Sequence, residues 1–499
     1  MHAAERTAKT RRRLQAPSIA LLASVAGVTA ACSDEAPAPP REQAQNVVLI
    51  VIDTLRADRL GCYGWPRETS PAIDWLAETG TLFERNYSQG CWTVPSMISM
   101  MSGVSVTTEE TALSPQLTVL AEALQAKDVA TAGFVGNSVL WKDRGFERGF
   151  DTFELDRGSA LELAERFASW CGARAEAERD RRFFAWVHFK DPHHPYEPLP
   201  DYDLFEGPRP DLERLLPRWQ REAENADSLA GDAPSLDFEL SLARMQEHSN
   251  RYDGEVRMAD AGVQRVIDAL RETGELEETL IIVCSDHGEM LYEQLQQPGM
   301  IEMVVEREGG LPQGVADLFA RGHRPWYYEE LWNTPLVLRG PGVPSGERRS
   351  GLSANLDLFP TVLQAFDLPM LPWLEGRSLF GEGPGYERVF AYGHRTTAVI
   401  EDAGRKLVVQ PRKLYPPRED GSAPLQLFDL ASDPHEDRDL ADVDPDESRR
   451  LLDEIDRWRA ERAREVIEAT TAEQLEILRE LGYVGTGGVE VPEEDAPPR

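Results

Sequence analysis

The chain has 499 residues, of which 41% are hydrophobic, and it carries a formal net charge of -34. A chain of this length and composition can bury a full core and exceeds one simple domain, so we expect a large domain with a smaller one. The acidic balance excludes nucleic acid as a partner, because binding to a phosphate backbone requires a basic face. Such an acidic excess is typical of a solvated surface.

The N-terminal segment has the composition of an export signal. Arginines at 11–13 precede an apolar stretch at 16–30 that is too short and too rich in small residues to span a bilayer. A Thr-Ala-Ala-Cys run at 29–32 resembles a bacterial lipobox. We therefore expect a signal peptide at 1–31, a lipid at Cys32 as the chain's only membrane attachment, and a lipoprotein of the cell envelope, in the periplasm or at the outer membrane. Ordinary signal cleavage without a lipid is the alternative.

Four further cysteines, Cys62, Cys91, Cys171 and Cys284, have no CxxC or other metal-binding spacing. The sequence therefore indicates neither a zinc site nor a dense disulfide framework. Cys284 lies in an apolar run and is predicted to be a buried thiol. One disulfide among the four could still form in an oxidising compartment.

The fold is predicted to begin after a polar tether at 32–45. Asn46–Ile52 is a continuous apolar run, typical of a strand buried on both faces. Similar runs recur at Val129–Val135, Phe183–Phe189, Leu280–Ser285 and Pro335–Leu338. Helical patterns lie between them, such as the apolar positions from Val256 to Leu270, with Gly274 as a stop. This alternation predicts an α/β fold, a mostly parallel sheet flanked by helices.

The pattern of predicted secondary structure changes near residue 386. Short strands follow, including a hairpin from Ala398 to Gln410 that turns at 402–404, and then a charged helix from about Pro445 to Leu481. We expect a catalytic domain at 46–385, a smaller C-terminal α+β subdomain at 386–485 and a disordered acidic tail at 486–499. The polar segments 200–249 and 291–322 are predicted insertions near the mouth of a site.

Ligands of open parallel sheets collect beyond the carboxyl ends of the strands, so residues directly after the apolar runs are site candidates. Asp53 follows the first run, although alone it could be a helix N-cap. Asp286 and His287 follow the run that ends at Cys284. A carboxylate and an imidazole side by side at a strand end can ligate one divalent metal, and Gly288 would let the backbone approach closely.

Thr93 precedes a predicted short helix with Pro95 in its first turn and Gly103 at its end. A helix N-terminus offers free N–H groups and the positive end of a dipole to an anion, and it favours ionisation of a hydroxyl nucleophile. A simple threonine cap is the alternative.

Candidate proton donors lie in the run from His188 to Tyr196, which also follows a strand and contains Lys190 and His193. Such side chains can hold an oxyanion or protonate a leaving group. A structural turn would explain the prolines of this run but not its histidines. His323 is a further candidate donor.

Together these residues resemble the sulfatase family of the alkaline-phosphatase superfamily. The matching segments, in order, are Asp53–Arg56 with Leu60–Gly64, Asp191–Tyr196, Asp286–Glu289, Tyr328–Glu330 with Pro335, Asp357–Thr361, and Leu427–Pro434. The later segments are individually weak, but their order and spacing over most of the mature chain make the resemblance specific. It implies an ester hydrolase with an alkaline-phosphatase-like fold, and it places Arg56 among the active-site residues.

The chain departs from the family at the nucleophile. The family carries a Cys or Ser two residues before the motif proline, which becomes formylglycine, and an Arg two residues after it; here these positions hold Thr93 and Met97. Cys91 is displaced by two residues, so no formylglycine is expected. Thr54 replaces the family's second metal-binding aspartate, and its Gly-Lys-Trp-His segment has no counterpart. The remaining set is similar to single-metal superfamily phosphotransferases that use a threonine nucleophile.

We therefore predict that Asp53, Asp286 and His287 bind one divalent cation, either Ca²⁺, Mn²⁺ or Zn²⁺. Thr93 would then attack a small or glycan-linked anionic ester. A formylglycine hydrate can expel sulfate through its second hydroxyl, which threonine lacks, so the sequence favours phosphoester hydrolysis or transfer.

The predicted leaving-group donors are His193, His323 and Lys190. Two alternative functions stay open. One is an arylsulfatase-like hydrolase of sulfuric esters that works without formylglycine, and the other is an inactive metal-binding protein that binds a glycan or a protein partner. The retained metal ligands argue against the inactive protein.

Overall fold

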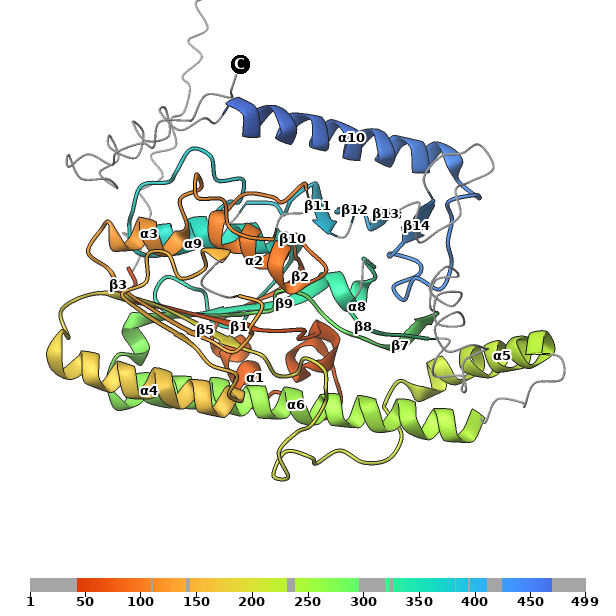
Figure 1. Ribbon diagram of the computed structural model, residues 1–499, viewed down its shortest axis with the longest axis horizontal. Coiled ribbons are helices and arrows are strands. Elements are labelled where there is room, and N and C mark those ends of the chain that lie inside the picture. Colours follow the sequence, from red (N-terminus) through yellow and green to blue (C-terminus); the bar gives the residue numbers. More distant parts are fainter. Residues whose placement is uncertain are drawn as a thin grey trace, which may run out of the picture. The chain divides into compact units, whose positions relative to one another are not determined.

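The computed structural model describes residues 43–468 except 109–110, 141–143, 231–237, 296–318, 324–325, 382, 394 and 411–423. Its centre is an eight-stranded sheet in the order β10-β2-β9-β6-β1-β5-β3-β4 (Figure 1). These strands are β1 (Asn46–Ile52), β2 (Thr81–Tyr87), β3 (Ala130–Val135), β4 (Thr152–Leu155), β5 (Phe183–Phe189), β6 (Thr279–Cys284), β9 (Asn333–Arg339) and β10 (Glu347–Ala354). Only β9 runs antiparallel to its neighbours within this sheet. The predicted mostly parallel α/β sheet is confirmed.

Helices cover both faces of this sheet (Figure 1). They are α1 (Pro71–Thr79), α4 (Ala160–Ala177) and α6 (Phe238–Glu272) on one face, and α2 (Thr93–Ser102), α3 (Leu120–Gln125) and α9 (Leu358–Ala365) on the other. All seven residues of β1 are buried, and their side chains alternate between the two layers. Burying one aliphatic side chain of this kind stabilises the fold by about 1.5–3 kcal/mol. The continuous apolar run at the start of the fold therefore anchors both helical layers.

Strands β2, β4 and β10 were not predicted, because polar residues interrupt their apolar pattern. The helix predicted from Val256 onward is the second half of α6, which begins at Phe238. The insertion predicted at 200–249 therefore contains α5 (Leu212–Ala230) and the first turns of α6. The ends of the second predicted insertion form β7 (Met290–Leu295) and β8 (Phe319–Gly322), an antiparallel pair; residues 296–318 lie outside the described part.

The C-terminal part of the chain forms a second sheet, antiparallel throughout, from β11 (Arg388–Gly393), β12 (Thr396–Glu401), β13 (Arg405–Val409) and β14 (Leu425–Asp429). The predicted hairpin is confirmed, and Gly404 takes a φ of 89° at its turn. Helix α10 (Pro445–Glu468) packs on β12 and β13 through Leu451 and Ile455. The predicted extension of this helix to Leu481 lies outside the described residues, as does the tail.

Lys406 of β13 ties the second sheet to the first domain. Its ammonium group is buried, 2.9 Å from Glu329 Oε1 and 2.8 Å from Glu436 Oε1. Glu329 begins α8 (Glu329–Trp332), and it also accepts a hydrogen bond from the hydroxyl of Tyr87 in β2. This buried bridge fixes the C-terminal sheet against the segment that enters β9.

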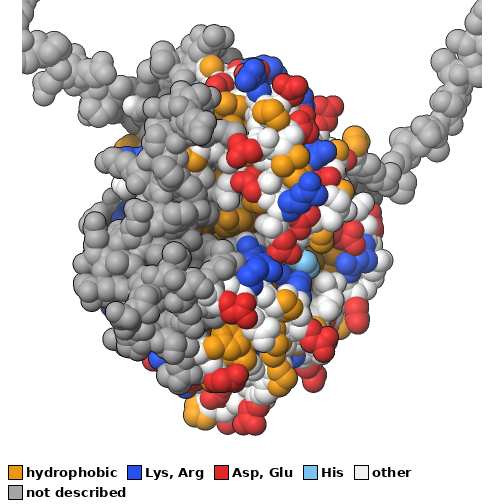
Figure 2. All heavy atoms as spheres, turned by 90° about the vertical axis from the view of Figure 1, so that its right-hand side faces the viewer, with side chains coloured by type: hydrophobic (Ala, Val, Ile, Leu, Met, Phe, Trp, Pro, Cys, Tyr) orange, Lys and Arg blue, Asp and Glu red, His pale blue; other side chains and the backbone are white. Residues whose placement is uncertain are grey.

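Cys62, Cys91, Cys171 and Cys284 are not joined in disulfides, and the predicted burial of Cys284 is confirmed. Within the described ranges, no helix is long and apolar enough to cross a membrane. The predicted signal peptide and Cys32 lie outside those ranges. On the face shown in Figure 2, acidic side chains are interspersed with Lys and Arg, as expected for a solvated acidic surface.

Candidate active site

The candidate site lies just beyond one row of paired residues in four neighbouring strands. That row, in sheet order, is Val135, His188, Val51 and Cys284. Two residues further along these strands stand Asn137, Lys190, Asp53 and Asp286. Because strand side chains alternate with a period of two, this second row leaves the sheet on the same side as the first. The sheet thus collects two carboxylates, an amide and an amine at one edge, on the face covered by α2.

Asp53, Asp286 and His287 converge in this row, with one ligand atom from each lying within 4.8 Å of the others. The Nε2 atom of His287 is 3.5 Å from Asp53 Oδ1 and 3.6 Å from Asp286 Oδ2. Its Nδ1 atom lies 2.9 Å from the carbonyl of Gly288, which can only accept, so the ring proton is on Nδ1 and Nε2 presents a lone pair. All three side chains are buried.

Two of these ligand atoms, Asp53 Oδ1 and Asp286 Oδ2, are buried without a hydrogen-bond partner. Orphaned buried oxygens are costly unless a donor or a cation meets them. The second oxygen of each carboxylate accepts hydrogen bonds. Asp53 Oδ2 accepts one from Asn137, and Asp286 Oδ1 accepts from the N–H groups of Thr54 and His287. Two carboxylate oxygens without a donor, together with an imidazole nitrogen that presents its lone pair, fit a single divalent cation.

The electrostatics of the three residues agree with this assignment. Burial raises the pKa of Asp53, and the neighbouring charge of Asp286 raises it further. Burial also raises the pKa of Asp286 and lowers the pKa of His287, which keeps the imidazole neutral. Two carboxylates that repel each other in a buried site are the arrangement that a bound cation stabilises.

Thr93 is the first residue of α2, and its Oγ1 atom lies 3.4 Å from Nε2 of His287. The helix is pinned to the metal-binding motif because the hydroxyl of Ser96 donates to the carbonyl of Asp286 at 2.6 Å. Cys91 packs elsewhere, among the buried aromatic residues beneath the C-terminal sheet. The structure therefore brings Thr93, and not Cys91, to the triad of ligands.

Two of the predicted proton donors meet beside the triad. The ring centroid of His323 is 4.6 Å from that of His287 and 4.8 Å from that of His193. His193 sits on a turn closed by its own N–H, which donates to the carbonyl of Lys190 at 2.9 Å. The charge of Lys190 acts against the burial that raises the pKa of Asp53, so its ammonium group lies within electrostatic range of the triad.

Arg56 lies behind the site and is buried. Its guanidinium pairs with Asp58 at 2.6 Å and with Glu293 at 2.9 Å, and it donates to the backbone carbonyl of Glu289 at 3.0 Å. These contacts place the predicted catalytic arginine in an ion-pair network that supports the segment after His287. The geometry gives it a positioning role.

Three polar residues at the site had no role assigned from the sequence, although Glu289 and His188 stand within segments singled out there. Asn137 follows β3 and could have been found by the same strand-end rule that singled out Asp53. Glu289 is buried next to the metal-binding motif. His188 is buried with no hydrogen bond to either ring nitrogen, and burial lowers its pKa to about 4. No pattern in the sequence distinguished its position from an ordinary strand end.

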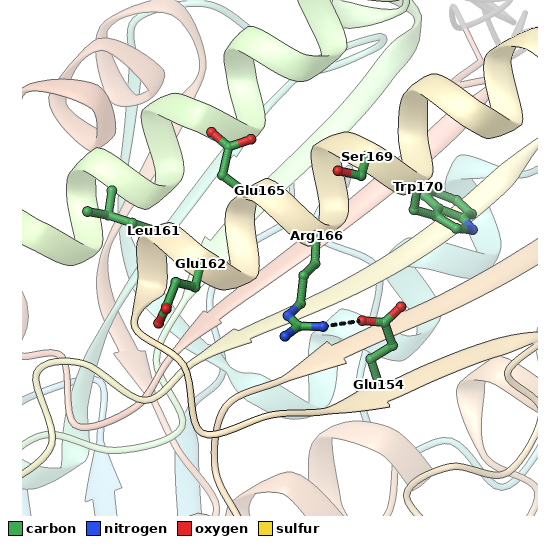
Figure 3. Close-up of a pocket in the computed structure, with 7 residues that line it drawn as sticks. All are labelled: Glu154, Leu161, Glu162, Glu165, Arg166, Ser169 and Trp170. Carbon is green, nitrogen blue, oxygen red and sulfur yellow. Dashed lines mark hydrogen bonds and ion pairs between the residues drawn. The ribbon is translucent and has the colours of Figure 1, made fainter.

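A surface hollow of about 740 Å³ lies along α4, between Glu154, Arg166 and Trp170 (Figure 3). Arg166 and Glu154 pair across it at 3.2 Å. Helix α4 covers the face of the sheet opposite to α2, and none of the candidate site residues lines this hollow. The hollow is therefore separate from the triad.

The fold and the site have the arrangement expected of the sulfatase family within the alkaline-phosphatase superfamily. The sequence profile described as Sulfatase matches residues 45–368, so the chain belongs to the sulfatase family. Members of this family are in general metal-dependent, in line with the cation site that Asp53, Asp286 and His287 could form.

Curated relatives are similar over part of their length. The chain is 27% identical to choline-sulfatase of Rhizobium meliloti over 281 residues, which cover 53% of this chain and 47% of that enzyme. It is 29% identical to arylsulfatase K of Gallus gallus over 210 residues, which cover 39% of this chain and 34% of that protein. The match thus spans about half or less of each relative.

Solved structures share the fold over most of both chains. A protein solved in complex with its substrate D-glucosamine-2-N,6-O-disulfate has a TM-score of 0.63 and 17% identity, covering 84% of this chain and 98% of its own. The phosphonate monoester hydrolase of Agrobacterium radiobacter has a TM-score of 0.62 and 19% identity, covering 84% of this chain and 96% of its own. Both likenesses support the alkaline-phosphatase-like fold.

Proposed function

We propose that this protein is a metal-dependent phosphoester hydrolase or phosphotransferase with Thr93 as its nucleophile. One observation carries the proposal: Oγ1 of Thr93 lies 3.4 Å from Nε2 of His287, at the N-terminus of a helix and beside two orphaned carboxylate oxygens. In metal-assisted ester cleavage the nucleophile lies beside the cation, and the hydroxyl of Thr93 has this position relative to the candidate cation site.

A divalent cation held by Asp53, Asp286 and His287 would supply positive charge that favours the ionised hydroxyl and an anionic ester. Oγ1 of Thr93 attacks phosphorus, and the N-terminal amides of α2 face the equatorial oxygens. As the bond to the leaving oxygen breaks, His323 or His193 gives that oxygen a proton. Water or a second alcohol then displaces the threonine ester in line and regenerates Thr93.

Phosphorus is favoured over sulfur because Thr93 has one hydroxyl and cannot expel sulfate by elimination. Sulfuric ester hydrolysis is the second candidate. It is supported by the similarity to choline-sulfatase and by the fold shared with a protein solved with a disulfated sugar. Either chemistry suits a small or glycan-linked anionic ester as the substrate.

The test is a paired substrate screen with purified protein. Matched 4-nitrophenyl sulfate, phosphate monoester, phosphodiester and phosphonate monoester are offered with Ca²⁺, Mn²⁺ or Zn²⁺. We expect a phosphorus ester to be cleaved fastest, and only with added metal. Cleavage of the sulfate alone would favour the second candidate, and a metal-binding protein that cleaves none of the four would favour the inactive one.

We also propose that the mature protein begins at Cys32 with a lipid and is held at the cell envelope. The short apolar stretch and the Thr-Ala-Ala-Cys run support this. Mass spectrometry of the mature N-terminus should give a lipid-modified Cys32. A detergent-free soluble product that begins elsewhere would remove the anchor.

A further inference from the structure

Glu289 is a buried carboxylate to which the proposed mechanism has given no task. Its backbone is fixed on both sides. A Cβ on the preceding Gly288 would lie 1.9 Å from the carbonyl oxygen of Glu330. Only a glycine therefore lets these two backbone segments come so close. The N–H of Glu289 donates to the same carbonyl at 3.2 Å, and its own carbonyl accepts from Arg56 at 3.0 Å. These contacts fix the backbone of Glu289 and therefore restrict where its side chain can lie.

The carboxylate of Glu289 is 0% exposed, and neither oxygen has a hydrogen-bond partner of good geometry. The structure gives it one ion-pair partner, His323, whose Nδ1 atom lies 3.5 Å from Oε1. A buried carboxylate needs a polar or charged neighbour, and His323 is the imidazole that the structure pairs with it, beside the hydroxyl of Tyr196. His323 is 22% exposed and thus lies between the buried carboxylate and the open side of the site.

We propose that Glu289 is a positioning residue that orients His323 as the proton donor to the leaving group. This inference rests on the proposed ester cleavage by Thr93. A carboxylate beside Nδ1 holds the imidazole in one orientation, with Nδ1–H toward the carboxylate and Nε2 directed away from it. The ring contacts of His323 with His287 and His193 place it beside the triad, where the proposed ester would bind.

The proton and electron pairs balance over one turnover. Oγ1 of Thr93, ionised at the start of turnover, forms a bond to phosphorus; the bond to the leaving oxygen breaks, and its electron pair stays on that oxygen, which takes the proton from Nε2 of His323. Neutral His323 then removes a proton from the water that enters along the same line. The bond between phosphorus and Oγ1 breaks, and its electron pair returns Thr93 to the ionised form. Glu289 keeps its charge throughout and holds Nδ1–H in both steps.

Tyr196 is the second neighbour of Glu289 and provides a matched control. Burial raises the pKa of the Tyr196 hydroxyl, and the charge of Glu289 raises it further, so the phenol stays protonated beside the carboxylate. If Glu289 acted through this tyrosine, Tyr196→Phe would reproduce the effect of Glu289→Gln. If it acts through His323, Tyr196→Phe will not.

The test measures how rate depends on the leaving group, in metal-loaded protein. A proton donor matters for a poor leaving group such as an alkyl or phenyl ester and little for 4-nitrophenolate. We expect Glu289→Gln to lower kcat/KM about 10–100-fold for the phenyl ester and about threefold or less for the 4-nitrophenyl ester. His323→Gln should show the same pattern more strongly, and Tyr196→Phe should follow the wild type. Equal losses on both esters, with unchanged metal content, would overturn the inference.

A second measurement does not need turnover. The ring ¹⁵N shifts of His323, assigned by comparison with His323→Gln in metal-free protein, should report Nδ1–H in the wild type and a mixture of tautomers in Glu289→Gln. Unchanged shifts in Glu289→Gln would contradict the pairing. A wild type that cleaves no ester but shows these shifts would remove the proposed function and keep the pair, whereas an active wild type with unchanged shifts would do the reverse.

Discussion

Two buried polar clusters adjoin each other behind the carboxyl ends of β1 and β6, and they differ in how their charges are compensated. In the metal triad, formed by Asp53, Asp286 and His287, three acceptor atoms converge and the two carboxylate oxygens among them have no donor. In the arginine cluster, formed by Arg56, Arg59 and Arg209 around Glu293, opposite charges alternate.

The arginine cluster is compensated contact by contact. Oε1 of Glu293 lies 2.9 Å from Arg56, 3.3 Å from Arg59 and 2.7 Å from Arg209. Arg59 also pairs with Asp253 at 3.3 Å. Both clusters are buried, so burial does not tell them apart. Buried acceptors without a donor thus indicate a ligand-binding site, whereas buried charges paired with opposite charges indicate structural support for that site.

The largest expected effect is on the chemistry of the triad. Thr93→Ala should lower kcat by at least about 10³-fold because it removes the attacking atom, while metal content stays near that of the wild type. Asp286→Ala and His287→Ala should lower metal content and turnover together. Metal analysis and initial rates check this contrast. Turnover at the native rate in Thr93→Ala would instead support direct attack by water.

The next largest effect breaks the arginine cluster. Glu293→Ala should lower the free energy of unfolding by about 3–5 kcal/mol, because it leaves three buried guanidinium groups without their shared partner. Urea unfolding measures the change. Thr93→Ala is the matched control and should change stability by less than about 1 kcal/mol. A stable Glu293→Ala protein would mean that water or other acceptors replace the carboxylate.

In the metal triad, by contrast, removing a charge should increase the stability of the metal-free protein. Asp53→Asn removes one of two buried carboxylate charges, so in metal-free protein it should raise the free energy of unfolding by about 1–3 kcal/mol. It should also weaken the stabilisation that added metal gives the wild type, which is about 2.7 kcal/mol at a metal concentration of 100 times Kd. Urea titrations with and without metal check both signs. Destabilisation in the absence of metal would refute the contrast.

A smaller, pH-dependent effect is expected beside the turn that carries His193. Burial and the adjacent carboxyl group of Asp191 raise the pKa of Glu255 from its ordinary 4.5 to about 8, although Lys190 opposes the shift. The folded protein therefore keeps a proton that the unfolded chain releases. The resulting stability is full below pH of about 4.5 and is lost as the pH rises through about 8.

Glu255→Gln should flatten this decline, because an amide cannot release the proton. With about 1.4 kcal/mol for each pKa unit, the wild type should lose at least ~1 kcal/mol across the window and the variant less. Urea unfolding at several pH values within the window measures it. Parallel pH profiles for the two proteins would show that Glu255 is ionised in the folded state.

The last prediction is that neither Cys91 nor Thr93 is chemically modified. Mass spectrometry of the peptide that contains Cys91 and Thr93 should give unmodified side chains, because Cys91 packs away from the triad and a threonine has no formylglycine route. An aldehyde at Cys91 would move the nucleophile out of the position proposed here.

The sequence predicted the metal triad because each ligand directly follows a strongly apolar strand, and strand ends of a parallel sheet meet at one edge. Asn137 obeys the same rule but follows a strand of weaker pattern. The sequence could assign no role to His188 or Glu293, since a buried histidine or glutamate is recognised as functional only by the residues around it. Arg56 was expected to be catalytic, and only its contacts with Asp58 and Glu293 revealed its supporting place.

The sequence by itself determined the α/β class, the central strands, the hairpin at Gly404, the short helix at Thr93 and the identity of the triad. These follow from local patterns: apolar periodicity, turn residues and polar residues at strand ends. The tertiary structure decided which buried charges are matched, that Thr93 faces His287 while Cys91 does not, and that Glu289 meets His323. Such pairings join residues far apart in the chain, and their free energy depends on distance and burial, which no local pattern encodes.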